Sequence, residues 1–188
     1  MRYTQTFAAI VLGVVLAVPA AHAQVLKDAL KKSDQKIDNA DAAAMKQLAQ
    51  ANLNEIEGGK AAASKAQSAD VKQFAQKMAT DHQQMLSELE TLAKAKGVAL
   101  PQSGSLKDKA EMKLMERSSG AEFDKKYMEQ MVKDHQKDAK EVQDIVAKAK
   151  DPEFKAAVQK ASTKIQEHLQ LAQRIASQHG AAAGGTSK

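Results

Sequence analysis

Three histidines and one glutamate are the residues of this 188-residue chain whose types and spacing could do chemistry. His82, His135 and His168 each fall on a stripe of apolar residues at three- and four-residue steps, which predicts the buried side of a helix. Glu55 has the same kind of position in an earlier helix. All four lie about 15 residues into their helices, near mid-length, so a bundle would place them in one layer. Such layers are where helix bundles bind metal ions.

Three imidazoles and a carboxylate suit zinc, copper or iron. Four methionines near the histidines add a slight preference for copper, although methionine at such positions more often fills gaps in a core; they are Met78, Met85, Met128 and Met131. The alternative is a structural polar layer that fixes the register of the helices through hydrogen bonds and holds no ligand. The sequence leaves both interpretations open.

Asp81 and Asp134 directly precede two of these histidines. Adjacent residues point about 100° apart on a helix, so neither aspartate shares the stripe of its own histidine. Each is predicted either to orient a histidine of another helix by accepting its N–H, or to be a surface carboxylate.

The sequence favours a protein that is not an enzyme. Di-iron bundles use Glu-x-x-His motifs, but Ala79, Val132 and Ile165 stand three residues before the histidines. The serines lie at predicted helix starts and in loops, which leaves no nucleophile beside a base and an orienting group. The remaining catalytic alternative is an oxidoreductase with an unusual site.

The elements that would position these residues are helices, because strong helix formers dominate and strand-like alternation is missing. Ser119 and Glu122 form a capping-box pattern, and Gly180 is expected to end the last helix. We expect four long helices at about 41–66, 68–96, 119–149 and 152–179, with a shorter one at 106–117. The predicted domain is a bundle over 40–178, after a polar lead-in at 24–39 and before a flexible tail at 179–188.

The joins between these helices predict how they are connected. Two short joins imply two antiparallel hairpins, and the longer middle join can cross the length of the bundle. This favours an all-α, ferritin-like four-helix bundle with one crossover that contains a short extra helix. An aromatic-x3-Met-x2-Asp-His-Gln pattern starts at Phe74 and again at Tyr127. It indicates either duplicated hairpins or a coincidence among helical residues.

The first 23 residues resemble a secretory signal peptide. A basic start at Arg2, an apolar run over 7–18 and an Ala21-His22-Ala23 exit predict cleavage after Ala23 and a periplasmic or secreted protein. No later segment is apolar enough to span a membrane. The chain has no cysteine, so packing must provide its stability. Interspersed charges and 3% aromatic residues indicate solvated helix surfaces rather than nucleic-acid binding.

Several segments together resemble a known family. NLNEIEGGKAA, FAQKMATDHQQM, FDKKYMEQMVKDHQ and EHLQLAQ are similar to the exported bacterial family catalogued as domain of unknown function 4142. The resemblance covers about 43–175, and its two Asp-His pairs are the most specific part. It implies a ferritin-like bundle in which Glu55, His82, His135 and His168 match recurrent polar positions. Some members are labelled outer-membrane proteins, which implies at most a peripheral association with the envelope.

The function expected from the sequence is therefore an exported, non-catalytic bundle that binds a metal ion or small ligand at its Glu/His layer. The alternative is a structural or stress-protective envelope protein without a ligand. The physiological role and the oligomeric state are not predicted.

Overall fold

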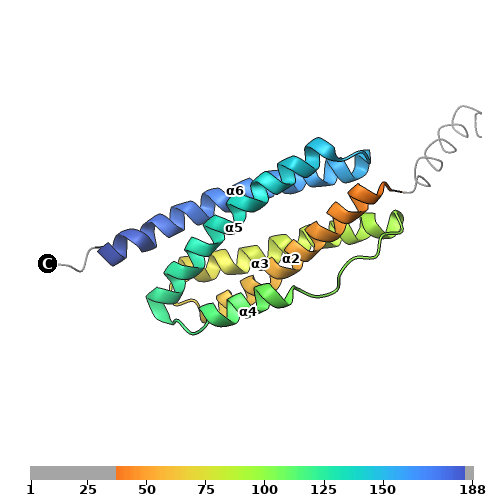
Figure 1. The fold of residues 1–188 in the computed structure, drawn as a ribbon. Helices are drawn as coiled ribbons and strands as arrows, with labels where there is room; N and C mark the ends of the chain where they lie inside the picture. The colour runs from red at the N-terminus through yellow and green to blue at the C-terminus, as the bar shows by residue number, and fades with distance from the viewer. Residues whose placement is uncertain (1–36, 185–188) are drawn as a thin grey trace, which may run out of the picture. The chain divides into compact units, whose positions relative to one another are not determined.

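The computed structural model describes residues 37–184, and within them the chain is a bundle of helices without strands. In chain order these are α2 (Asn39–Lys65), α3 (Ala69–Ala95), α4 (Leu106–Met115), α5 (Gly120–Lys148) and α6 (Pro152–Gly184) (Figure 1). The predicted all-α bundle is confirmed, and a ferritin-like crossover is compatible with it. The expected signal peptide and nearly all of the lead-in lie outside the described residues. No helix over 37–184 is both long and apolar enough to cross a membrane.

The four long helices form two antiparallel hairpins, α2 with α3 and α5 with α6. At one end of the bundle Lys96, after α3, forms an ion pair with Asp151, just before α6, at 2.8 Å. At the other end Asp70 of α3 lies 3.1 Å from His179 of α6. Helices α3 and α5 therefore run in the same direction. The connection over 96–119 returns along the bundle and carries α4, which lies beside α2 (Figure 1).

Two buried aspartates join the hairpins reciprocally. Asp41 of α2 accepts hydrogen bonds from the backbone amides of Lys150 and Asp151, at 2.9 and 2.7 Å, in the turn between α5 and α6. Asp124 of α5 accepts from the amides of residues 67 and 68, at 3.0 and 2.8 Å, in the turn between α2 and α3. Each hairpin thus supplies the acceptor for amides that the other hairpin's turn leaves without helical partners.

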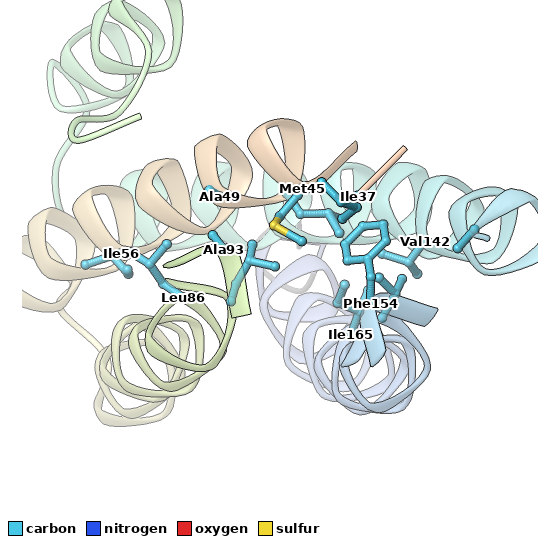
Figure 2. Close-up of a cluster of buried hydrophobic side chains, with 13 residues drawn as sticks. Ile37, Met45, Ala49, Ile56, Leu86, Ala93, Val142, Phe154 and Ile165 are labelled. Atoms are coloured by element: carbon cyan, nitrogen blue, oxygen red, sulfur yellow. The ribbon is translucent and has the colours of Figure 1, made fainter. Parts of the chain in front are cut away.

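The apolar core consists of two clusters. Figure 2 shows the first, in which Met45, Val142 and Phe154 converge from α2, α5 and α6. The second contains Phe74 and Tyr127, whose rings meet edge to face with centroids 6.3 Å apart. The buried histidines belong to neither cluster.

Two predicted details of the helix ends are wrong. Helix α6 runs to Gly184, past Gly180 and through part of the expected tail at 179–188. A single exposed glycine costs a helix only about 1 kcal/mol, and the three alanines after it are the best helix formers. Ser119 does precede α5, but its side chain makes no capping bond, and Glu122 pairs instead with Lys126 at 2.6 Å.

Adjacent glycines in α2 predict opposite effects of the same substitution. A Cβ at Gly59 would lie 2.8 Å from the carbonyl oxygen of Ala75 and 2.9 Å from the amide nitrogen of Ala79, both backbone atoms of α3. We expect Gly59→Ala to lower the free energy of unfolding by about 1–3 kcal/mol, as overpacking does. Gly58 has open space, so Gly58→Ala should raise it by about 1 kcal/mol. Urea unfolding followed by circular dichroism measures both, and equal effects would contradict the close approach of α2 and α3.

Candidate metal centre

Three histidines from three helices meet in the middle of the bundle. His82 of α3, His135 of α5 and His168 of α6 are buried, and their ring centroids are 5.2 to 5.9 Å apart. Each offers one ring nitrogen, and these three atoms all lie within 4.8 Å of one another. We call these three residues the histidine triad.

The protonation of the His82 ring follows from its neighbour on α2. Asn52 donates its side-chain amide to the carbonyl of Leu48 at 2.8 Å, so its Oδ1 is the atom facing His82. That oxygen lies 2.9 Å from His82 Nδ1, which must therefore carry the proton and donate. His82 Nε2 is left with its lone pair free.

The other two rings are held in the same manner. His135 Nδ1 donates to the backbone carbonyl of Met131 at 3.0 Å, which leaves Nε2 free. His168 Nε2 donates to the carboxylate of Asp81 at 2.8 Å, which leaves Nδ1 free. Asp81 also accepts from Lys77 at 2.7 Å, so its position is fixed from its own helix.

The three free nitrogens are the buried ring atoms without a hydrogen-bond partner. His82 Nε2, His135 Nε2 and His168 Nδ1 are each closed to solvent and unpaired. A buried polar atom without a partner costs about 1–3 kcal/mol. The bundle therefore bears this cost three times at one place, with three lone pairs brought close together.

Burial keeps the triad uncharged. It lowers the pKa of His82 well below its usual value, and the neighbouring His168 and His135 lower it further. Burial also lowers the pKa of His135. The pKa of His168 falls to about 4, again through burial, although the hydrogen bond to Asp81 opposes the change. At neutral pH all three rings are neutral imidazoles, the form that binds a metal ion.

Glu55 and Asp134, two residues that the sequence singled out, do not join the triad. Glu55 is absent from the group of converging ligand atoms, and burial raises the pKa of its carboxyl to about 8, with the charges of Asp134 and Asp108 adding to the effect. Its electrostatic neighbours thus include α5 and α4. Asp134 accepts from Gln130 of its own helix at 2.9 and 3.0 Å, and burial raises its pKa as well.

Asn52 is the α2 residue at the triad, and sequence reasoning missed its role. It lies on the predicted stripe three residues before Glu55, so the stripe was the signal that could have found it. The Asp-His-Gln pattern is also explained in part. Its two copies lie on the parallel helices α3 and α5, and its aromatic residues contact each other as its histidines do.

The triad fits a metal ion by its chemistry. Three neutral imidazoles suit zinc, copper or iron. A tetrahedral zinc ion with Zn–N bonds of about 2.0–2.1 Å holds its nitrogens roughly 3.3 Å apart, so the rings need to close by on the order of 1 Å. Asn52, Asp81 and the Met131 carbonyl occupy the positions from which such ligands are usually oriented. Three protein donors leave one position of a four-coordinate ion open.

Comparison with known proteins places the chain in a family. The family model described as domain of unknown function 4142 matches residues 26–175, most of the chain. This chain belongs to that family. The DUF4142 bundle is also similar to the crystal structure of a putative spore coat protein from Bacillus halodurans C-125. The two share 14% identity over 84% of this chain and 96% of that one, with a TM-score of 0.62, a likeness that shows the fold alone. The curated proteins contain no match to the DUF4142 chain.

Proposed function

We propose that this protein is an exported, non-catalytic metal-binding bundle that holds one divalent transition-metal ion with His82, His135 and His168. The observation that carries the proposal is the set of three buried ring nitrogens without partners. A metal ion satisfies all three at once, whereas no group in the described part of the chain does so. Export rests on the sequence of residues 1–23, and it implies that the ion is acquired in the periplasm or outside the cell.

The charges around the triad support a bound cation. Asp138 of α5 has its pKa raised to about 7, by burial first and then by the charge of Glu55. Glu55 and Asp134 also have raised pKa values. None of these three carboxyl groups forms an ion pair within residues 37–184, and a divalent ion among neutral imidazoles supplies a positive charge within the same bundle.

A second candidate is a structural layer that fixes the register of the helices. Two hydrogen bonds favour it, because Asn52 to His82 joins α2 to α3 and Asp81 to His168 joins α3 to α6. A register device, however, needs only these two bonds. It gives no reason for the free nitrogen on each ring, and His135 makes no bond outside its own helix.

Metal titration tests the proposal. We expect protein recovered from the periplasm, starting at Gln24, to bind one zinc or copper ion per chain, as measured by elemental analysis and calorimetric titration. Replacing all three histidines with glutamine should weaken binding at least a hundredfold, because each supplies a ligand. Asp81→Asn should weaken it by about 10–100-fold, as changes to a residue that orients a ligand do.

His179→Gln is the matched control, because His179 lies on α6 near the end of the bundle and contacts Asp70 rather than the triad. It should bind metal as the unchanged protein does. The metal site would be rejected if the protein held no metal after titration with zinc, copper and iron. It would also be rejected if the triple variant bound metal as tightly as the unchanged protein. A triple variant that loses stability while the unchanged protein binds no metal would favour the structural layer.

A further inference from the structure

A cavity of about 230 Å³ lies against His82, one of the three residues of the histidine triad. All four long helices line it, and it lies on the side of the triad that faces the turn between α5 and α6. Its walls are mainly aliphatic, and no phenylalanine, tyrosine or tryptophan lines it; the main wall residues are Leu48, Met85, Leu89, Val142, Val158 and Ile165. Asn52, His82 and Asp138 form its polar inner end.

The outer rim of the cavity is charged and easily opened. Glu88 of α3 and Lys160 of α6 line it and pair across it at 2.6 Å, with their side chains 41% and 67% exposed. An exposed pair of this kind contributes about 1 kcal/mol or less. Lys164, one turn along α6, lines the cavity too. Lys164 pairs with Glu167 on its own helix at 2.9 Å. A small molecule can therefore enter between α3 and α6 by separating only the weak pair of Glu88 and Lys160.

The coordination of the proposed ion gives this cavity a role. The triad supplies three nitrogen donors, and no fourth histidine or carboxylate in the described part of the chain joins them. A four-coordinate ion then has one position for a donor from outside. His82 is both a cavity wall and a proposed ligand. Its free Nε2 is closed to the cavity in the metal-free protein, so a donor atom in the cavity reaches the ion only after the rings close around that ion.

We propose, on the basis of the metal-binding function above, that the cavity binds a medium-chain aliphatic carboxylate whose head group takes the open position on the metal ion. A cavity of about 150 Å³ holds benzene, so this one accepts a flexible chain of roughly eight carbons. The walls match an aliphatic chain in chemistry. The head is anionic because the ion and its neutral imidazoles carry two positive charges. Lys160 and Lys164 do not decide the sign, since they already pair with Glu88 and Glu167.

Three of the four acidic groups on the cavity lining already have partners. Asp81 is held by Lys77 and His168. Glu88 pairs with Lys160, and Glu141 accepts from Gln47 at 2.6 Å. The charges of these three groups are thus balanced or solvated within the bundle. Asp138, at the inner end, has no ion pair or hydrogen bond within residues 37–184, and its single negative charge still leaves a divalent ion with a net positive charge.

Calorimetric titration of zinc-loaded protein with octanoate tests the inference. Octanoate should bind at least tenfold tighter than acetate, which has the head without the chain, and than octylamine, which has the chain with a positive head. In cobalt-loaded protein, octanoate should change the visible absorption of the ion, because the head replaces another donor. These comparisons use the unchanged protein, so they hold even if a variant fails to fold.

Two phenylalanine substitutions on α6 test whether octanoate binds in the cavity. Ala161→Phe fills the cavity from α6 and should weaken octanoate binding at least tenfold while zinc stays stoichiometric. Ala156→Phe, on the exposed side of the same helix, should leave binding unchanged. On zinc-loaded protein, equal binding of acetate or octylamine, an unchanged cobalt spectrum, or indifference to Ala161→Phe would each overturn the inference and leave the metal site standing. Absence of zinc by elemental analysis, measured before any octanoate is added, would overturn both.

Discussion

Replacing Glu55 with glutamine is expected to stabilise the metal-free protein by about 4 kcal/mol at pH 8 and to change little at pH 4.5. Burial, with the charges of Asp134 and Asp108, raises the pKa of Glu55 from 4.5 to about 8. Between these values the unfolded chain has released the proton and the folded chain still holds it. Stability is therefore lost as the pH rises through this range, at about 1.4 kcal/mol per unit. Glutamine has the same shape and no proton to lose.

Urea unfolding of metal-free protein at both pH values measures this effect. Glu90→Gln is the control, because Glu90 is exposed on α3. The two variants should differ at pH 8 and agree at pH 4.5. A Glu55→Gln protein as stable as the Glu90→Gln protein at pH 8 would show that Glu55 is not held in an unfavourable environment.

His168→Gln is expected to remove about 3 kcal/mol of the acid sensitivity of the metal-free protein between pH 7.5 and pH 4. The pKa of His168 is about 4 in the folded chain, against 6.5 ordinarily. As the pH falls below 6.5 the unfolded chain binds a proton that the folded chain cannot accept, so stability declines until the pH reaches about 4. Glutamine can still donate to Asp81 and does not titrate in this range.

The measurement compares free energies of unfolding of the two proteins across this pH range, again by urea and circular dichroism. His179→Gln is the control for the loss of one histidine outside the triad. If His168→Gln and the unchanged protein lose the same stability on acidification, His168 is not buried as a neutral ring.

These two effects have opposite signs in overlapping pH ranges. The triad destabilises the fold on acidification below pH 6.5, while Glu55 and Asp138 destabilise it as the pH rises above about 4.5. Between about pH 4.5 and 6.5 the contributions of Glu55 and His168 therefore offset each other, and each substitution exposes the contribution that the other group had offset.

Much of the fold was predictable because its signals are local. Apolar residues at three- and four-residue steps, Gly97 after α3 and Pro152 at the start of α6 fix the helices and their ends. The prediction that Gly180 ends α6 was wrong because helix propensity is summed over neighbouring residues. One unfavourable residue before three alanines does not end a helix. The backbone contacts made by Asp41 and Asp124 join residues far apart in sequence, and no local pattern indicates them.

The sequence could place the candidate site residues only to within the width of the buried stripe on each helix. A buried stripe is at least 100° wide, so position alone cannot separate Asn52 from Glu55, which point about 60° apart. Their neighbours decide the difference: Asn52 contacts His82, while Glu55 is close enough to Asp134 of α5 and Asp108 of α4 for their charges to raise its pKa. Which nitrogen of each ring is free also depends on partners on other helices or on backbone carbonyls, and these appear only in the folded chain.

The reciprocal aspartate contacts have a consequence for how the chain folds. The turn between α2 and α3 is completed by Asp124 of the second hairpin, and the turn between α5 and α6 by Asp41 of the first. Neither hairpin reaches its final hydrogen bonding until the other docks. Late docking of the two halves thus becomes a single cooperative step, and it also closes the histidine triad, since His82 comes from one half and His135 and His168 from the other.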